Sequence, residues 1–182
     1  GTYTIPETVS TLSGYSFEGY NTANIVIPST VITIGDYAFA NTGNFNEITS
    51  WAEGTQQIGV HAFSGCVNLK ATLPASVTKI GAYGFAYCTN IQIDISKCGL
   101  TEIAEYLFYE CDNLHQLTLP VGVTTIGAYA FYKCDNLNQV TLPDSVHTIQ
   151  EGAFSSCTNL HSITIPEGVT AIENNTFDGC QN

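Results

Sequence analysis

The sequence contains no arginine and no methionine, and it has only four lysines. Sixteen acidic residues oppose those lysines, so the formal net charge at pH 7 is −12. Phosphate binding depends on clustered Lys and Arg side chains, so we expect no nucleic acid partner. An anionic membrane surface is disfavoured for the same reason.

Long hydrophobic runs are missing as well. No uninterrupted apolar segment approaches the roughly 18 residues that cross a bilayer, and the N-terminus has neither the basic region nor the apolar segment of a signal peptide. We therefore expect no membrane insertion of this chain. Because it starts at Gly1 and ends within a repeat, we expect a fragment of a longer protein, with targeting signals or anchors outside it. We expect the fragment to be a monomer.

Motifs that carry chemistry are also scarce. The sequence has no C-x-x-C pair, no Gly-rich phosphate loop after a strand, and no recurring set of nucleophile, base and orienting residue. His115 and His161 share a repeat position, but two layers would hold them about 9–10 Å apart, too far to share a metal ion. A β-helix lyase or glycosidase would need acids clustered on adjacent layers, and here they are scattered. The sequence predicts no enzymatic activity, no cofactor and no metal.

What the chain does have is a strict internal repeat. With 44% hydrophobic residues it can bury a sizeable core, so disorder is excluded. Eight of the nine phenylalanines recur every 22 to 24 residues, and such self-similarity is typical of solenoids. The eight are Phe17, Phe39, Phe63, Phe85, Phe108, Phe131, Phe154 and Phe177.

Other residue types recur in register with that phenylalanine. An aliphatic residue precedes it by five positions, a cysteine follows it by three in six repeats, and an asparagine follows it by five in seven repeats. All six prolines close short segments in which apolar and polar residues alternate, such as residues 117–119 and 163–165. This alternation predicts a short strand with its aliphatic side chains inward, and the proline ends it.

The rest of each unit is predicted to be a second short extended piece, such as residues 123–126, and then a bend or single helical turn, such as residues 127–131. Equivalent strands of successive units must run parallel, about 4.8 Å apart. One unit of about 23 residues cannot offset its own ordering entropy, so stability must come from stacked neighbours.

The repeat pattern Leu-x-x-Ile-x-Ile-Pro-x-x-Val-Thr-x-Ile-Gly-x-x-Ala-Phe-x-x-Cys-x-Asn-Leu resembles the BspA-like, or Treponema-type, class of leucine-rich repeats. Its clearest copies are residues 114–136 and 137–159. The resemblance implies an α/β-type repeat solenoid, a right-handed leucine-rich-repeat superhelix with a parallel β-sheet, mostly strands and turns with little helix. We expect one domain over residues 1–182 with about eight repeats of 22–24 residues. The resemblance also implies a surface or secreted protein associated with adhesion to host proteins, extracellular matrix or other microbes.

Three departures from the pattern stand out. Trp51 and Ser96 occupy places where proline is expected, residues 43–57 are irregular, and residues 96–99 contain one residue more than the pattern. We interpret them as local bulges that leave the fold intact.

The recurring cysteines and asparagines are interpreted as structural. Stacked cysteines have parallel Cβ vectors, which suit disulfide geometry poorly, so we expect small buried core residues. Cys98 lies outside the column and is the strongest candidate for an exposed thiol. The asparagines stand at a turn, where each side chain is expected to bond backbone groups and its neighbours along the stack.

Two surfaces remain as candidates for ligand binding. The outward strand position carries mostly threonine, which is also simply a good exposed strand residue. Tyrosines gather near the ladder phenylalanine of three consecutive repeats, where they suit protein contacts or sugar stacking but also fit half-buried packing. The candidate residues are Tyr83, Tyr87, Tyr106, Tyr109, Tyr129, Tyr132, Thr72, Thr118, Thr141 and Thr164.

The sequence therefore favours a non-catalytic binding or adhesion module of a surface-exposed or secreted protein. Such a module would recognise a protein or glycan through an extended face of the solenoid. The alternative is a passive structural spacer that presents another domain. Buried tyrosines and a uniformly polar strand face would favour the spacer.

Overall fold

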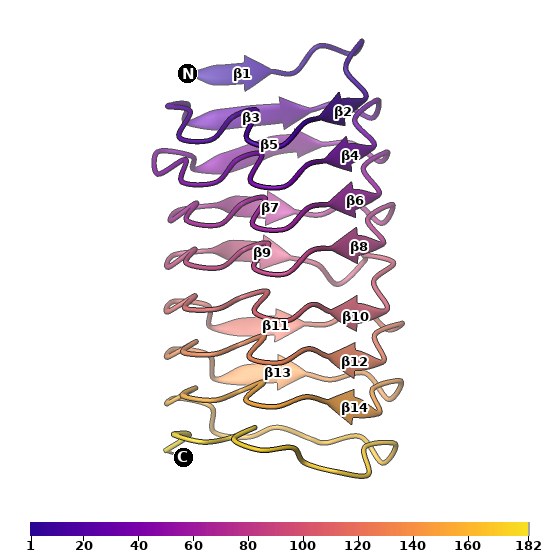
Figure 1. Ribbon diagram of the computed structural model, residues 1–182, viewed down its shortest axis with the longest axis vertical. Coiled ribbons are helices and arrows are strands. Elements are labelled where there is room, and N and C mark those ends of the chain that lie inside the picture. Colours follow the sequence, from indigo (N-terminus) through magenta and orange to yellow (C-terminus); the bar gives the residue numbers. More distant parts are fainter. Residues whose placement is uncertain (182) are drawn as a thin grey trace.

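The computed structural model describes residues 1–181, in which successive turns of chain stack along one axis with the two chain ends at opposite ends of the stack (Figure 1). Each turn within residues 2–149 contains a longer strand, a short strand and tight turns, whereas residues 150–181 contain tight turns and one isolated bridge at Ser162. The longer strands are β1 (Thr2–Thr4), β3 (Asn24–Ile27), β5 (Glu47–Trp51), β7 (Lys70–Thr72), β9 (Gln92–Asp94), β11 (Gln116–Thr118) and β13 (Gln139–Thr141). The two-residue strands are β2 (Thr11–Leu12), β4 (Thr33–Ile34), β6 (Gln57–Ile58), β8 (Lys79–Ile80), β10 (Glu102–Ile103), β12 (Thr125–Ile126) and β14 (Thr148–Ile149).

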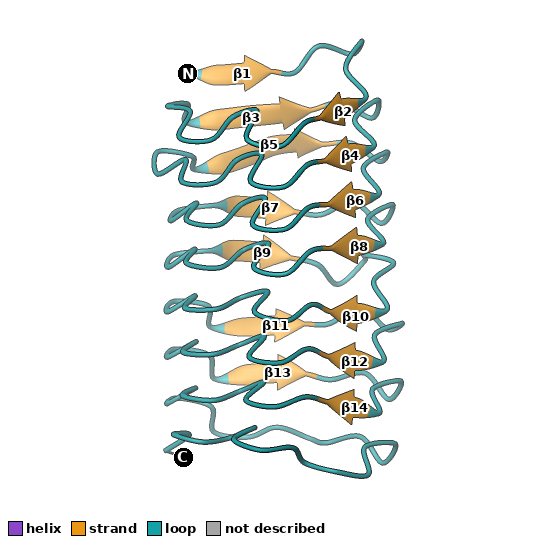
Figure 2. Cartoon of the chain, in the orientation of Figure 1, coloured by secondary structure: helices purple, strands orange, loops and turns teal. Residues whose placement is uncertain are grey.

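No helix occurs in residues 1–181, as Figure 2 shows by its strands and loops alone. The predicted parallel solenoid is confirmed, but the helical component of the α/β-type prediction is not found in that range. Residues 128–133, where a bend or a helical turn was expected, form tight turns. The right-handed winding stays a prediction.

Both strand columns form parallel sheets, and both sheets are interrupted at the same level. The longer strands pair in the order β1-β3-β5-β7-β9 and then β11-β13, while the short strands pair as β2-β4-β6-β8 and then β10-β12-β14. The extra residue in residues 96–99 lies at this level. The amide of Cys98 closes a turn onto the carbonyl of Ile95 at 3.0 Å, and the next residue, Gly99, bonds back to Val77 at 2.8 Å.

Strand β5 contains a bulge, and two details of the sequence prediction are wrong there. Strand alternation predicts that Thr49, which follows the inward Ile48, points outward. Ile48 pairs with Ile25, but Ser50 pairs with Val26, so Thr49 is the extra residue and Ser50 holds that outward position. Trp51 pairs with Ile27, an inward position, and therefore does not replace a proline. The bulge absorbs the extra length of this 24-residue repeat and turns the indole toward the core, against which it is partly buried.

The phenylalanine ladder forms the centre of the core. Neighbouring rings stack with centroids 5.0–5.8 Å apart and planes within 16° of parallel. From Phe39 to Phe154 the ladder rings have no exposed surface. Each ring thus buries both faces against its neighbours, as the stacking of the repeats predicts.

The cysteine column lies beside the phenylalanines. All seven cysteines are free, and six thiols, from Cys66 to Cys180, each donate to the carbonyl oxygen of the ladder phenylalanine of the preceding repeat at 3.1–3.2 Å. Burial raises the pKa of the Cys66 thiol to about 12. The interpretation of the column as core residues is confirmed for these positions, of which Cys180 is only partly buried.

Cys98 is also buried, so the prediction of an exposed thiol is wrong. The extra residue in residues 96–99 is accommodated with the Cys98 side chain turned inward, where its thiol lies 3.7 Å from the carbonyl oxygen of Pro74, while the buried Leu100 holds the position that Val77 has in the preceding repeat. Burial raises the pKa of its thiol to about 12, which makes the reactive thiolate scarce at neutral pH.

The asparagine ladder is confirmed as a structural device. Asn90 donates to Asn68 at 3.1 Å, Asn113 to Asn90 at 2.7 Å, and Asn136 to Asn113 at 3.0 Å. Asn136 also donates to the carbonyl oxygen of Asp112 at 3.0 Å. Side-chain amides thus satisfy one another and the backbone of the turns, as expected.

Candidate binding surfaces

An outer column of aromatic rings follows the short strands. Its members are Tyr15, Tyr37, His61, Tyr83, Tyr106 and Tyr129. Neighbouring rings stack with centroids 4.5–5.5 Å apart and planes within 13° of parallel. Repetition alone places these rings at stacking distance, so the stacking by itself says nothing about a ligand.

The backbone of this column is more informative. All six residues have a positive φ of 53–60°, and the next two repeats place Gly152 (φ 63°) and Asn175 (φ 57°) at the same position. A left-handed backbone costs a residue with a side chain roughly 1–2 kcal/mol, and glycine or asparagine adopts it most easily. The core does not require an aromatic ring here, because Gly152 and Asn175 satisfy the same turn. Folding therefore does not explain why tyrosine recurs at this position.

A second left-handed position follows each ladder phenylalanine by two residues. Its φ values range from 54° to 74°. The residues are Gly19, Asn41, Gly65, Tyr87, Glu110, Lys133, Ser156 and Gly179. Sequence analysis missed both left-handed positions, although glycine and asparagine recurring in register with aromatic or charged residues was the available signal.

Six tyrosines meet in one contiguous group, here called the tyrosine cluster: Tyr83, Tyr87, Tyr106, Tyr109, Tyr129 and Tyr132. Tyr109 is its centre. Its ring stacks on Tyr132 at 4.9 Å and meets the edges or tilted faces of Tyr87 at 5.5 Å and Tyr106 at 5.7 Å. The structure therefore brings all six predicted tyrosines together. Most are half-buried, and Tyr87 is 42% exposed.

The rings of the cluster cover one another's faces. Tyr106 lies between Tyr83 at 4.5 Å and Tyr129 at 5.5 Å, so neither of its faces is open to a flat ligand. Beyond Tyr129, the ring atoms lie where a side chain on Gly152 would otherwise start. The cluster thus offers ring edges and phenol groups, which suit a protein surface better than sugar stacking.

Acidic side chains border the cluster. The Tyr129 hydroxyl donates to Glu151 at 3.3 Å, and Lys133 forms an ion pair with Glu110 at 3.4 Å while its ammonium group lies 5.6 Å from the centre of the Tyr132 ring. Burial raises the pKa of Tyr109, and the nearby Glu110 carboxylate raises it further. The Tyr109 phenol therefore stays a neutral hydrogen-bonding group at physiological pH.

The threonines of the strand face are divided between two sheets. Thr118 and Thr141 are exposed and paired on β11 and β13, but Thr72 on β7 belongs to the other sheet and pairs with Asp94. Thr164 is exposed and lies outside any strand. The four predicted threonines thus do not form one uninterrupted row.

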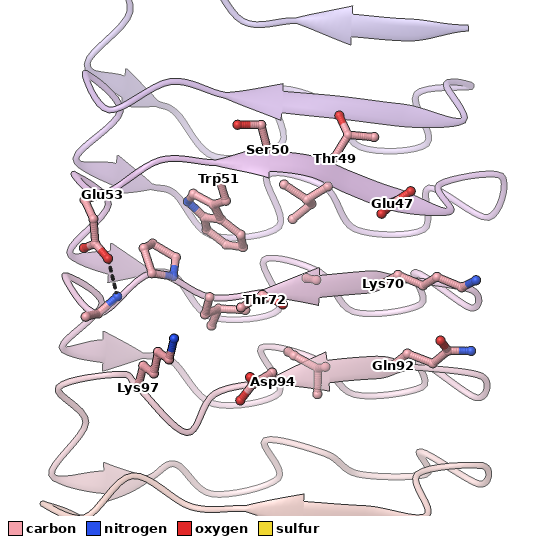
Figure 3. Close-up of a pocket in the computed structure, with 16 residues that line it drawn as sticks. Glu47, Thr49, Ser50, Trp51, Glu53, Lys70, Thr72, Gln92, Asp94 and Lys97 are labelled. Atoms are coloured by element: carbon pink, nitrogen blue, oxygen red, sulfur yellow. Dashed lines mark hydrogen bonds between the residues drawn. The ribbon is translucent and has the colours of Figure 1, made fainter.

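A hollow of about 610 Å³ lies over strands β5, β7 and β9, where the core-facing but only partly buried Trp51 still reaches the surface (Figure 3). Trp51, Pro74 and the polar side chains of Thr72, Asp94 and Lys97 line it. The strand face is therefore not uniformly polar. Sequence analysis missed the hollow, because the departures that form it belong to separate repeats and appear only as isolated irregularities.

In residues 1–181 no group of three or more His, Cys, Asp or Glu side chains is placed to hold a metal ion. Over the same residues, no helix is long and apolar enough to cross a membrane.

Fold and repeat chemistry together define a leucine-rich-repeat solenoid of parallel strands. The family described as BspA type leucine rich repeat region matches residues 2–71 and 56–182, with six copies of the repeat. These matches span nearly the whole chain, and the protein belongs to this family.

Solved structures agree with this assignment. A leucine rich cell surface protein from Faecalibacterium prausnitzii is 32% identical with a TM-score of 0.66, and the match covers 98% of this chain and 45% of that one. A leucine-rich repeat protein from T. pallidum is 29% identical with a TM-score of 0.73, and the match covers 94% of this chain and 71% of that one. The pneumococcal vaccine antigen PcpA, at 21% identity and a TM-score of 0.58 over 98% of this chain and 60% of that one, shares the fold.

No curated protein matches the sequence. The chain spans less than half of the length of the F. prausnitzii protein, so that protein's activity and partners do not transfer directly.

Proposed function

We propose that the chain is a non-catalytic binding or adhesion module of a surface-exposed or secreted protein. It recognises a protein or glycan through an extended face of the solenoid, needs no cofactor and works as a monomer. The solved F. prausnitzii relative is described as a cell surface protein, which supports this location.

The tyrosine cluster carries the proposal. Four of its six members, Tyr83, Tyr87, Tyr106 and Tyr129, occupy left-handed positions that glycine or asparagine fills in other repeats. Residues that repeatedly adopt an unfavourable left-handed backbone at one surface favour a role of that surface in recognition. Tyrosine is enriched among the residues that dominate protein interfaces, and the covered ring faces favour a protein over a sugar at this surface.

A passive spacer is the competing function. The stacked, half-buried rings favour it, because they stiffen the edge of the solenoid without any ligand. The exposed Tyr87 and the mixed character of the strand face favour binding instead.

The two functions separate in a binding experiment. The chain and two double variants are applied to an array of matrix proteins and glycans, after circular dichroism has verified their folding. We expect a signal for the unmodified chain that falls at least about tenfold in Tyr106→Ala with Tyr129→Ala, since each interface tyrosine typically contributes roughly 1–2 kcal/mol.

The matched control is Tyr15→Ala with Tyr37→Ala, which removes two stacked rings of the same column outside the cluster. This control should keep the signal. If no form binds anything on the array, the spacer function is correct.

A further inference from the structure

The irregularities of the repeat converge on one hollow. The bulge in β5 brings Trp51 to it, Asp94 stands there in register with Thr72, and the lengthened turn of residues 96–99 contributes Lys97. These features lie more than 40 residues apart at their extremes, yet strands β5, β7 and β9 are consecutive in one sheet. Where a regular repeat departs from its own pattern at several places that meet in space, function is the expected reason.

The apolar side of the hollow is fixed in position. The Trp51 indole donates to the Thr55 hydroxyl at 2.8 Å, and that hydroxyl donates to the carbonyl oxygen of Val31 at 2.8 Å. The ring also meets Phe63 with centroids 5.8 Å apart. Trp51 is therefore held in one orientation next to Pro74, and a ligand would lose little free energy to ordering them.

Two carboxylates of the lining, those of Asp94 and Glu53, are also held before any ligand arrives. Asp94 accepts the amide of Ser96 at 2.9 Å and its hydroxyl at 2.7 Å, both on Oδ1, so Oδ2 keeps its lone pairs for another donor. These bonds lower the pKa of Asp94. On the other rim Glu53 accepts two backbone amides, from Ala75 at 2.9 Å and from the next residue at 2.8 Å. Figure 3 shows the Lys97 side chain extending toward the hollow between these groups.

The chemistry of the lining selects among ligands. An extended peptide could not add to the sheet here, because β7 already pairs with β5 and β9 on both sides. An ion of either sign is disfavoured, since Glu47, Glu53 and Asp94 stand beside Lys70 and Lys97. Carboxylate acceptors held in place, with Lys97 and Thr72 as donors beside one indole, suit a ligand with many hydroxyl groups and an apolar ring face. The volume lies within the roughly 300–1,000 Å³ that is usual for small-molecule sites.

We propose that this hollow binds a neutral saccharide unit, whose ring packs against Trp51 and whose hydroxyl groups bond Asp94, Lys97 and Thr72. The site is separate from the tyrosine cluster, and neither depends on the other.

Trp51 is the only tryptophan in the chain, so its fluorescence reports directly on the hollow. Excitation at the red edge of its absorption avoids the ten tyrosines. Galactose, mannose and N-acetylglucosamine are titrated separately, with triglycine as a peptide probe. We expect a saturable change with at least one sugar, with a Kd on the order of millimolar for a single unit.

Asp94→Thr is the decisive variant, because it installs the residue that pairs with it at position 72 and so preserves the repeat. It should weaken sugar binding at least about tenfold, consistent with the loss of a charge-assisted hydrogen bond. Lys97→Gln tests a second polar contact of the hollow should the first variant fail to fold. Thr141→Ala, on β13 outside the hollow, and the double variant Tyr106→Ala with Tyr129→Ala should leave the titration unchanged.

The proposal is overturned if no sugar gives a saturable change, if triglycine alone does so, or if binding survives both Asp94→Thr and Lys97→Gln. Loss of sugar binding in the tyrosine double variant would equally contradict it. Because the array experiment depends on the tyrosine cluster and this titration on Trp51, failure of one leaves the other intact.

Discussion

The inner phenylalanine column and the outer tyrosine column have nearly the same stacking geometry, with ring centroids 5.0–5.8 Å and 4.5–5.5 Å apart. They differ in burial and in backbone. From Phe39 to Phe154 the inner rings are enclosed. The outer rings from Tyr37 to Tyr129 are half-buried, Tyr15 is 57% exposed, and all of these outer residues have a left-handed backbone. Ring stacking is therefore a consequence of the repeat in both columns. The left-handed backbone distinguishes the outer rings as those that the fold does not require.

The largest expected difference between the columns is in stability. Phe108→Ala should lower the free energy of unfolding by about 3–5 kcal/mol, because it opens a cavity between two buried rings. Tyr106→Ala, two residues earlier, should cost much less, since its ring is only half-buried. Urea denaturation of both variants measures this. Equal losses would mean that the outer column belongs to the core.

The inner side of the solenoid should also respond to alkaline pH before the outer side does. Burial raises the pKa of Cys66 from 9.0 to about 12, so the neutral thiol stabilises the fold fully below pH 9 and this contribution is lost as pH rises from 9 toward 12. Tyrosine ionises normally near 10.0, and burial raises the pKa of Tyr83 above that value.

Urea denaturation at pH 8, 9 and 10 should therefore show stability falling between pH 9 and 10, by at most about 1.4 kcal/mol per pH unit for each thiol. A Cys66→Ala variant should show a shallower decline. An unchanged stability up to pH 10 would contradict the burial of the thiol column.

A smaller effect isolates the backbone of the outer column. Tyr106→Gly should be more stable than Tyr106→Ala by about 1 kcal/mol, because glycine adopts a φ of 57° without the strain that alanine meets there. Tyr109, which is outside the left-handed positions, is the matched control, and there alanine should be the more stable replacement. Thermal unfolding of the four variants shows, at each site, whether the glycine or the alanine variant is more stable. If glycine or alanine were the more stable replacement at both sites, backbone strain at Tyr106 would be contradicted.

The smallest effect should come from the polar ladder. Asn113→Ala removes an exposed side chain that donates at 2.7 Å to Asn90 and accepts at 3.0 Å from Asn136. The expected loss is about 1 kcal/mol or less. Asn138→Ala, an exposed asparagine outside the ladder, is the control in the same denaturation assay. A loss as large as that of Phe108→Ala would place the ladder with the core.

The sequence was sufficient for the repeated parts of this fold. Phenylalanine, cysteine and asparagine recur because each has one environment copied in every turn, and the structure confirms all three environments. The left-handed positions escaped detection because tyrosine and lysine occupy some of them, and those residues normally avoid such a backbone.

The irregular parts could not be placed from the sequence. An extra residue can be absorbed at several points of a turn at similar local cost, and only packing against the neighbouring turns decides between them. That choice determined whether Trp51 stands at the proline position and whether Cys98 is buried, and both were predicted wrongly. The hollow depends on the same choice.

The interruption of both sheets between β9 and β11 and between β8 and β10 has a mechanical consequence. Ladder hydrogen bonds run along the stacking axis, so a pulling force along that axis loads them directly. At the interrupted level the load passes instead to the turns, through bonds such as Phe85 to Leu107 at 3.0 Å and Tyr87 to Tyr109 at 2.7 Å. A chain stretched between two anchored ends would therefore part first at this level, into two blocks that each keep continuous sheets.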